Sequence, residues 1–437
     1  MKIKDILNVT GGKLLNPSDR FTDQEISSFV IDSRKSKKGS FFIPLKGSNV
    51  DGHEFITDAL KRGSVGYLTS QKTSEKNGIL VEDTYKALVD IARYKRKNFS
   101  YVIGITGTSG KTTTKDILKV LLSQFFSVYG TEGNYNNEIG LPLTLANAHS
   151  SDVCILEMGA GKIGDITYLS EIARHDIAVL TSVGHGHTEK FGSFENVVKG
   201  KGEIFSVSEK AVLPYELLNF YQKELKGKSF ITFGLKGDIR ILDIKLVKEG
   251  TSGVISFKNE EVRLTIPVYN KALFFNIGAS AGVLYYLGYD PVKYLKVLQG
   301  FSVPEGRGNI IKVGNLTIID DTYNANPVSV KNAIETLSSL YGKKVIVLGD
   351  MLELGDFSKQ LHKEIGKLIE KSSIDYALFF GKNMRYAFEE TTKGFYFETK
   401  EELVKKLVEI TKKEEWFVLI KGSRGMKMED IIYFLQS

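Results

Sequence analysis

The stretch YVIGITGTSGKTTT, from Tyr101 to Thr114, decides the fold of the middle of the chain. It opens with an unbroken apolar run typical of a buried parallel strand, passes through a Gly/Thr loop and enters a helix near Lys111. In such a loop, glycines let backbone amides approach phosphates and the helix start adds positive potential. Lys111 and Thr112 are residue types that reach phosphate oxygens and hold Mg²⁺. The stretch therefore predicts a phosphate-binding loop, in a variant form because Ile105 occupies the position of the usual first glycine.

Working outward, the surrounding sequence continues as α/β protein. Apolar runs at 153–157 and 177–182 predict further core strands, and alternating patterns at 239–247 and 253–257 predict a hairpin whose turn is residues 248–251. Beyond residue 303, four more apolar runs alternate with helical stretches, which predicts a doubly wound region. They lie at 316–320, 344–348, 376–380 and 416–420.

The N-terminal part has short strand-like runs, such as 40–44, followed by a helical pattern through Ala87, Leu88, Ile91 and Ala92. We therefore expect an α/β protein of three domains. These are a small mixed α/β N-terminal domain (1–98), a central P-loop-type parallel α/β ATPase domain with a β-hairpin insert (99–302), and a C-terminal doubly wound Rossmann-like domain (303–437).

Composition narrows the function classes. The 437 residues are 42% hydrophobic and carry a formal net charge of +7, which suits a phosphorylated small molecule better than a polybasic nucleic-acid surface. A single cysteine, Cys154 within an apolar run, excludes a disulfide framework. No apolar stretch approaches the roughly 20 residues that span a bilayer, and the start lacks the apolar core of a signal peptide. We expect a cytoplasmic monomer that neither binds nucleic acid nor inserts into a membrane.

Several motifs resemble those of one family. The loop Gly107-Thr108-Ser109-Gly110-Lys111-Thr112-Thr113 resembles the one shared by Mur ligases and folylpolyglutamate synthetases. Segments 32–34, 42–47 and 51–53 look like the Mur ligase nucleotide-sugar domain, and 133–140 followed by Pro142 resembles its central substrate loop. Asp320-Asp321-Thr322-Tyr323-Asn324-Ala325-Asn326-Pro327 resembles the signature of the family branch that adds D-alanyl-D-alanine, and 348–355 and 421–424 are similarly close to that branch.

The resemblance implies an ATP-dependent amide ligase of peptidoglycan synthesis. Such an enzyme joins D-alanyl-D-alanine to UDP-N-acetylmuramoyl-tripeptide through an acyl phosphate, with ATP and two Mg²⁺ ions as cofactors. The alternatives are a sibling ligase that adds the third amino acid, a folylpolyglutamate synthetase and, from another class, a P-loop NTPase acting on nucleic acid. The motif at 320–327 argues against both sibling ligases, and no aromatic and basic RNA-binding motif supports the NTPase.

The metal ligands implied by the resemblance are Thr112, Glu157, His187 and Lys201. Glu157 ends an apolar strand, where α/β folds bind ligands, and carboxylate oxygens suit Mg²⁺. Spacing alone does not choose between His185 and His187, whereas alignment with the family selects His187. Likewise Lys-Gly-Glu-Ile-Phe selects Lys201 over Lys199, with Lys201 carbamylated to N6-carboxylysine. The family usually has asparagine where this chain has Ser182.

The resemblance also assigns the remaining site residues. Catalysis would involve Lys111, Glu157, His187, Lys201, Arg307 and Lys421. Nucleotide contacts would come from the phosphate loop, Asn276 near adenine, Arg307 near the phosphates and Asp321 at the ribose. Taken alone, Asn276 reads as a helix N-cap, and Asn324 and Asn326 as turn residues before a proline. The substrate-binding residues expected are Ser33, Arg34, Lys46, His53, Asn134, Asn137, Tyr323, Asn324, Asn326 and Ser423. Outside these sets, His362 reads as a structural residue.

Overall fold

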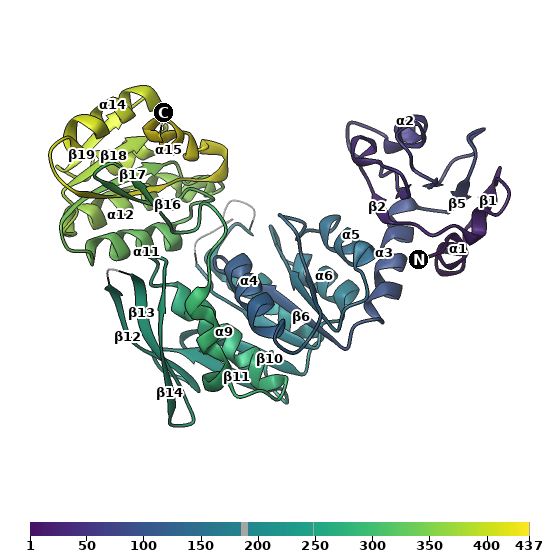
Figure 1. Cartoon of the computed structure of the whole chain (residues 1–437), viewed down its shortest axis with the longest axis horizontal. Helices are drawn as coiled ribbons and strands as arrows, with labels where there is room; N and C mark the ends of the chain where they lie inside the picture. Colours follow the sequence, from purple (N-terminus) through teal and green to yellow (C-terminus); the bar gives the residue numbers. More distant parts are fainter. Residues whose placement is uncertain (185–190, 248, 437) are drawn as a thin grey trace. The chain divides into compact units, whose positions relative to one another are not determined.

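The computed structural model describes residues 1–437 except 185–190, 248 and 437. In this described part the strands form three sheets, of five, nine and six strands, which follow one another along the chain (Figure 1). The chain forms two compact units. One contains residues 1–104, 126–158 and 167–176, and the other 105–125, 159–166 and 177–437. The predicted α/β class is confirmed, while the predicted domain limits stay a prediction.

The N-terminal sheet has the strand order β1-β5-β4-β3-β2, and all its pairs are parallel except β1 with β5. Its strands are β1 Lys13–Leu15, β2 Ser28–Val30, β3 Ser40–Phe42, β4 Gly66–Thr69 and β5 Gly78–Leu80, and its helices are α1 Ile3–Thr10, α2 Ile56–Lys61 and α3 Thr84–Arg96. Asp83 caps α3 by accepting from the Lys86 N–H. The apolar face predicted for this helix is buried, as expected for an amphipathic helix.

Helix α5 (Gly140–Asn147) is tied to this sheet. Leu143 and Ala146 belong to the apolar cluster that also holds Phe29 and Leu88. The Asn147 side-chain amide accepts from the Phe29 N–H (2.8 Å) and donates to the Phe29 carbonyl (3.0 Å). One side chain thus satisfies both backbone groups of a residue in strand β2, and this joins the segment after β7 to the N-terminal sheet.

The nine-stranded sheet has the order β14-β13-β12-β11-β10-β9-β6-β8-β7. Its strands are β6 Tyr101–Thr106, β7 Val128–Gly130, β8 Val153–Glu157, β9 Ile177–Leu180, β10 Lys210–Pro214, β11 Ser229–Gly234, β12 Ile239–Val247, β13 Gly250–Phe257 and β14 Glu260–Ile266. The helices of this region, besides α5, are α4 Lys111–Leu122, α6 Asp165–Ala173, α8 Phe194–Gly202, α9 Leu273–Tyr286 and α10 Pro291–Tyr294. Helices α4 and α9 pack against each other, and this brings α9 to the phosphate loop.

The predicted hairpin is β12 and β13, which pair antiparallel, and β14 extends them as a third antiparallel strand. Strand β12 also pairs with β11, so the hairpin continues the central sheet. The predicted turn at 248–251 is too long, because strand β13 (Gly250–Phe257) begins inside it at Gly250. A Cβ on Gly250 would lie 2.0 Å from the Ile266 carbonyl oxygen, so glycine here permits a close strand approach that hydropathy alone does not reveal.

The C-terminal sheet has the order β15-β16-β20-β17-β18-β19, with only β15 antiparallel to its neighbour. Its elements are β15 Asn309–Val313, β16 Leu316–Asp321, α11 Pro327–Ser338, β17 Lys343–Gly349, α12 Ser358–Lys371, β18 Tyr376–Phe380, α13 Met384–Phe388, β19 Gly394–Phe397, α14 Lys400–Thr411, β20 Trp416–Lys421 and α15 Glu429–Gln436. Alternate strand residues enter two apolar clusters, one with α11, α12 and α13 and the other with α14 and α15. This is the predicted doubly wound arrangement.

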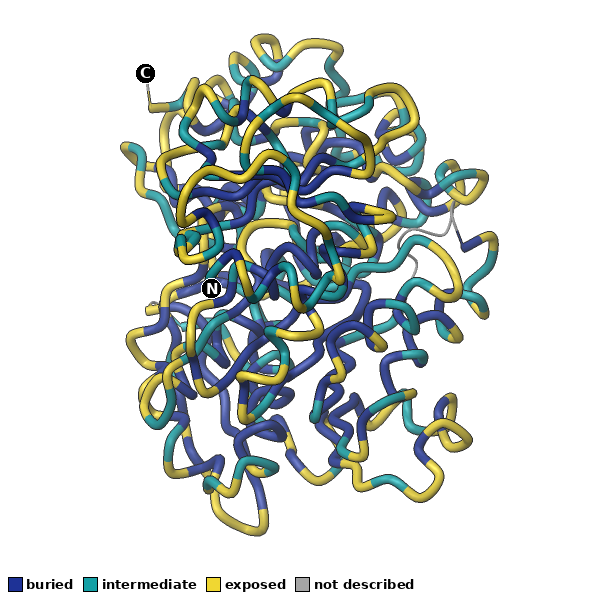
Figure 2. The backbone as a smooth tube through the Cα atoms, turned by 90° about the vertical axis from the view of Figure 1, so that its right-hand side faces the viewer, coloured by how far each residue is buried: buried dark blue, intermediate teal, exposed yellow. Residues whose placement is uncertain are grey.

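Burial follows this layering. Strands β8, β9 and β13 are buried at every position, as the dark tube in Figure 2 indicates for much of the interior. In the described residues, no helix is both long and apolar enough to cross a membrane. Helix α9 is apolar nearly all round because it is covered by the central sheet and α4.

Candidate active site

The phosphate loop is shaped by two glycines. Gly107 and Gly110 have φ angles of +153° and +88°, and Gly110 precedes the first residue of α4. A Cβ on Gly107 would lie 2.1 Å from Thr181 Oγ1, and one on Gly110 would lie 2.4 Å from Asn276 Oδ1. At both positions, therefore, the backbone bends and approaches its neighbours in a way that a side chain would prevent.

Lys111 begins helix α4 and folds back over the loop, where its Nζ donates to the Gly107 carbonyl (2.7 Å). Thr112 and Thr113 follow in the first turn, where helix N–H groups lack intrahelical acceptors. The loop thus combines a lysine ammonium, hydroxyls and the positive end of a 12-residue helix, as an anion-binding loop requires.

The segment after strand β9 holds the phosphate loop in place. The sequence interpretation did not predict this role. Ser182 Oγ accepts from the Ser109 N–H (2.9 Å) and donates to the Ser109 carbonyl (3.0 Å), which also accepts from Thr181 Oγ1 (2.5 Å). Thr108 N–H donates to the Ser182 carbonyl. Ser182, the departure from the family pattern, therefore holds the loop in place. Two hydroxyl residues directly after a buried strand were the available signal.

Asn276 lies inside helix α9, since the helix begins at Leu273 and its N-cap is Ala272. The interpretation of Asn276 taken alone as an N-cap is therefore wrong, because α9 begins four residues before the helix that Asn276 would cap. Its Oδ1 accepts from Thr114 Oγ1 (3.3 Å) and faces Gly110. The structure thus brings Asn276 to the phosphate loop.

The two lysines of α8 differ in environment. Lys199 is exposed, whereas Lys201 is only 1% exposed and its Nζ lies 5.8 Å from the centre of the Phe191 ring. The glycines on either side of Lys201 give room for rings: a Cβ on Gly200 would meet Phe191 at 2.5 Å, and one on Gly202 would meet Tyr221 at 2.5 Å. Phe191 thus lies beside the Lys201 amine, and the packing of this region leaves the lysine buried.

This burial changes the chemistry of Lys201. The pKa of its amine is lowered to about 7, mainly by burial and also by the nearby Lys111 ammonium, while the carboxylates of Asp165 and Glu203 act in the opposite direction. A substantial fraction of the Lys201 side chain is consequently neutral near pH 7, and a neutral amine is nucleophilic.

Of the other predicted metal ligands, Glu157 is the last residue of β8 and is 1% exposed. Its backbone N–H donates to Thr131 Oγ1 (3.0 Å), which fixes the strand end. His187 lies outside the described residues. Among the residues that are described, no three His, Cys, Asp or Glu side chains gather in a way that could hold a metal ion.

At the C-terminal sheet, Asp321 and Lys421 end neighbouring parallel strands in register. Lys421 Nζ lies 2.7 Å from Asp321 Oδ2 and donates to the Asn324 carbonyl (2.8 Å). Burial raises the pKa of the Asp321 carboxyl, and the adjacent Lys421 ammonium counteracts this rise. The pair places one carboxyl group and one lysine amine at the carboxyl edge of the sheet, where ligands of open α/β sheets bind.

Arg307 is held at the same edge. Asp320, which the sequence interpretation did not single out, accepts from the Gly306 N–H (3.0 Å) and from Thr322 Oγ1 (2.6 Å). The turn at Gly306 (φ +77°) places the Arg307 guanidinium 4.0 Å from the centre of the Tyr323 ring. Tyr323 thus orients a predicted phosphate ligand through a cation–π contact.

The predicted dipeptide residues divide into two kinds. Tyr323 and Asn324 are exposed, whereas Ser423 is buried, accepting from the Leu352 N–H (2.8 Å) and donating to the Ala325 carbonyl (3.1 Å). Asn326 caps helix α11, whereas its local interpretation was a turn residue before a proline. In addition, its Nδ2 donates to Ser109 Oγ (3.0 Å), a contact with the phosphate loop.

The predicted nucleotide-sugar residues lie in the segments that follow strands β2 and β3 of the N-terminal sheet. Arg34 is exposed and pairs with Asp32 (2.8 Å), Ser33 is buried, and Lys46 is exposed. His53 Nδ1 contacts Asp51 (2.6 Å) while its Nε2 accepts from the Ser70 N–H (3.1 Å). These two contacts fix the imidazole ring between Asp51 and Ser70.

The central substrate loop shows one contact that the sequence interpretation missed. Asn134 and Asn137 are exposed, and Asn137 Oδ1 accepts from the Gly140 N–H at the start of α5. Lys35 Nζ donates to the Tyr135 hydroxyl (2.8 Å), which links this loop to the segment after β2. Lys35 directly follows the predicted pair Ser33-Arg34. This position was the only feature of the sequence that could have indicated its contact with Tyr135.

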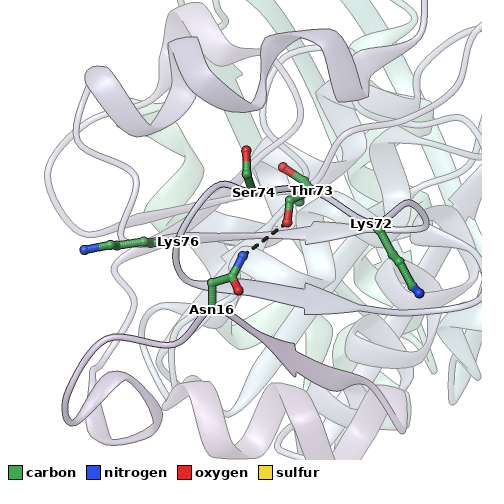
Figure 3. Close-up of a pocket in the computed structure, with 5 residues that line it drawn as sticks. All are labelled: Asn16, Lys72, Thr73, Ser74 and Lys76. Atoms are coloured by element: carbon green, nitrogen blue, oxygen red, sulfur yellow. Dashed lines mark hydrogen bonds between the residues drawn. The ribbon is translucent and has the colours of Figure 1, made fainter.

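A shallow hollow elsewhere on the N-terminal sheet contains none of the predicted site residues (Figure 3). Asn16 donates from its side chain to the Thr73 carbonyl there (3.1 Å), while Lys72 and Lys76 extend to solvent.

His362 has a structural role, as predicted: its Nε2 accepts from the Met351 N–H and its Nδ1 donates to the Ser358 carbonyl.

Comparison with known proteins places these features in a family context. Family models match the chain at residues 25–96 (Mur ligase family, catalytic domain), 105–284 (Mur ligase middle domain) and 306–424 (Mur ligase, glutamate ligase domain). A UDP-N-acetylmuramoyl-tripeptide--D-alanyl-D-alanine ligase of Bacillus subtilis is 37% identical, covering 98% of this chain and 97% of the relative.

Solved structures agree. A crystal structure of MurF from Acinetobacter baumannii superposes with a TM-score of 0.92 at 28% identity, covering 100% of this chain and 98% of that one. MurF ligase from Thermotoga maritima, in complex with ADP, gives a TM-score of 0.86 at 33% identity, covering 94% and 97%. The likeness therefore extends over the whole chain and includes a nucleotide-bound relative.

Proposed function

This chain belongs to the Mur ligase family, and from that premise we propose that it joins D-alanyl-D-alanine to UDP-N-acetylmuramoyl-tripeptide at the expense of ATP. The observation that carries the proposal is the match of 98% of the chain to a relative with this activity in its name. The phosphate loop at the start of α4 supplies the matching ATP chemistry.

The reaction must activate a carboxylate, because amide formation in water is uphill. A terminal carboxylate oxygen of the tripeptide attacks the γ-phosphorus of ATP, and ADP leaves. The free amine of D-alanyl-D-alanine then attacks the acyl carbon, loses a proton, and the tetrahedral intermediate expels inorganic phosphate. The products are UDP-N-acetylmuramoyl-pentapeptide, ADP and phosphate.

We propose the following roles on the nucleotide side. Residues 107–113 hold the phosphates, with Lys111 neutralising charge that builds up as the γ-phosphoryl group moves. Asn276 contacts the adenine and Asp321 the ribose. Arg307 and Lys421 supply further positive charge. The Tyr323 ring and the Asp321 carboxylate support this proposal, because they orient these two cations before substrate binds.

Mg²⁺ would shield the negative charges that the reaction brings together, and we propose Thr112, Glu157, His187 and Lys201 as its ligands. An ammonium would repel the ion, so Lys201 must first be modified. Its buried amine, with a pKa of about 7, can attack the carbon of CO₂ and lose a proton, giving N6-carboxylysine. The buried carboxylate of Glu157 is the type of oxygen ligand that this metal prefers.

On the substrate side, we propose that the N-terminal sheet receives the UDP-sugar through Ser33, Arg34, Lys46 and His53, with Asn134 and Asn137 at the peptide. The dipeptide would meet Tyr323 and Asn324, while Asn326 and Ser423 shape that region through their hydrogen bonds. We further propose that the protein acts in the cytoplasm as a monomer.

The test is a ligation assay with purified protein, ATP, Mg²⁺, the UDP-linked tripeptide and D-alanyl-D-alanine, in which each component is omitted in turn. We expect ADP release to require both peptide substrates and the pentapeptide to appear by mass spectrometry. Tripeptides ending in lysine or diaminopimelate, compared side by side, identify the third residue. Activity with a free amino acid on the dipeptide precursor, or with folate and glutamate, would instead assign a sibling function, and stimulation by nucleic acid would favour the NTPase.

A further inference from the structure

The first turn of helix α11 contacts the phosphate loop through Asn326. Its side-chain amide makes two sets of contacts: Oδ1 accepts from the Ser329 N–H (2.9 Å), which caps the helix, and Nδ2 donates to Ser109 Oγ (3.0 Å), which also lies 3.4 Å from Oδ1. The two residues joined by the second bond are 217 positions apart in the chain. The cap alone does not explain this contact, since it uses only the oxygen atom.

A second contact lies beside the first. A Cβ on Gly184 would lie 2.2 Å from Val328 Cγ2, so the second residue of α11 packs directly on this glycine. Gly184 is in turn bound to the loop, because its N–H donates to Thr108 Oγ1 (3.1 Å), which donates to the Gly184 carbonyl (3.2 Å). The start of α11 therefore meets two consecutive loop residues, Ser109 directly and Thr108 through Gly184.

The loop end of this contact is held firmly. Thr181 and Ser182 bind both the N–H and the carbonyl of Ser109, so the Ser109 hydroxyl projects from a fixed backbone. A serine or threonine at position 326 would also cap the helix, but its hydroxyl is too short to keep the cap and reach Ser109 together. Asparagine is thus specifically suited to the double contact.

We propose that Asn326 is a positioning residue that couples helix α11 to the phosphate loop through Ser109, so that nucleotide affinity depends on the side chain at position 326. The proposal rests on the proposed function, because it takes residues 107–113 as the site of ATP. It extends that function by assigning to the motif at 320–327 an effect on the nucleotide as well as on the dipeptide.

The test is a double-mutant cycle on the full chain with wild type, Ser109→Ala, Asn326→Ser and the double variant. The dissociation constant for ADP is measured by titration calorimetry without any peptide substrate, so that a role of these residues in dipeptide binding does not affect the result. We expect Asn326→Ser to weaken ADP binding about three- to tenfold in the wild-type background, the range for one neutral hydrogen bond. We expect no further weakening in the Ser109→Ala background.

Ser329→Ala is the matched control. The Ser329 hydroxyl accepts from the Asn326 N–H and donates to the Asn326 carbonyl, so these hydrogen bonds belong to the capping box and not to the loop contact. We expect this variant to lower the melting temperature while ADP affinity stays unchanged, which separates a weakened helix from a lost loop contact. Asn326→Thr, which retains a capping hydroxyl, replaces Asn326→Ser if that variant does not fold.

Equal weakening by Asn326→Ser in both backgrounds, or no weakening in either, would overturn the proposal. The ligation assay on the wild type is read separately. A wild type that makes no pentapeptide would refute the proposed function, whereas an active wild type with an additive cycle would refute only the coupling through Ser109.

Discussion

At the scale of the residue, Lys201 shows how burial creates reactivity. It lies two residues from Lys199 in the same helix, yet Lys199 is exposed whereas Lys201 is buried beside the Phe191 ring. A charged amine in that environment is costly, so its pKa falls to about 7. Burying the charged amine lowers the free energy of unfolding of the protein. The neutral form of the amine is the form that carbamylation requires.

Lys201→Met should therefore make the protein more stable, in a way that depends on pH. The unfolded chain binds this proton up to pH 10.5 and the folded chain only to about pH 7, so the stability of the wild type rises with pH between these values. Relative to wild type, we expect Lys201→Met to gain at most about 5 kcal/mol at pH 6 and progressively less towards pH 10.

Urea unfolding at pH 6, 7.5 and 9 in buffers free of CO₂ measures this gain, since carbamylation would otherwise remove the charge. Lys199→Met, on the exposed side of the same helix, is the control and should show no comparable trend. A stability difference that stays constant with pH would contradict the buried, depressed amine. The same Lys201→Met variant should lose ligation activity, because methionine cannot be carbamylated.

At the scale of the element, helix α9 depends on close packing that brings Asn276 to the phosphate loop. Gly282 faces strand β10, where a Cβ would lie 2.7 Å from Val212 Cγ1 and 3.1 Å from Val212 Cγ2. Val212 is fully buried and cannot move aside without disturbing the core. Glycine in the middle of a helix, normally unfavourable, is here required by the sheet.

Gly282→Ala should consequently destabilise the protein by about 1–2 kcal/mol, because overpacking outweighs the gain in helix propensity of about 1 kcal/mol. The free energy of unfolding in urea is the measurement. Gly300→Ala serves as the control, since no atom lies within 4 Å of its added Cβ, and should change stability little. A stabilised Gly282→Ala would show that α9 can shift away from β10.

At the scale of the whole molecule, nucleotide binding should stabilise the unit that contains both the phosphate loop and the C-terminal sheet. This unit also holds the only tryptophan of the chain, Trp416, buried in strand β20. Its fluorescence therefore reports the unfolding of this unit directly. A ligand that binds only the folded form stabilises it by mass action.

We expect ADP at about 100 times its dissociation constant to stabilise the Trp416 transition by about 2.7 kcal/mol. Lys111→Ala should reduce this effect, because the variant lacks the cation proposed to contact the phosphates, and AMP should act more weakly than ADP since it lacks the β-phosphate. Thermal unfolding followed by fluorescence tests all three points. An equal shift for wild type and Lys111→Ala would argue against the loop as the nucleotide site.

The sequence by itself determined the α/β class, most strands, the phosphate loop and the family, because each depends on a local pattern. Apolar runs mark the strands at 101–106 and 153–157 wherever the chain later goes. The same locality explains the errors, since the start of α9 and the turn before Gly250 depend on neighbours that are remote in sequence.

Only the tertiary structure decided which groups meet. The burial of Lys201, the support of Ser109 by Ser182, the stacking of Arg307 on Tyr323 and the contact between Asn326 and Ser109 all join segments from different elements. Hydrogen-bond geometry and desolvation act over a few ångströms in space, whatever the separation along the chain. The residue types in the sequence therefore predicted the chemistry of this site, whereas tertiary packing determined which of these residues contact one another.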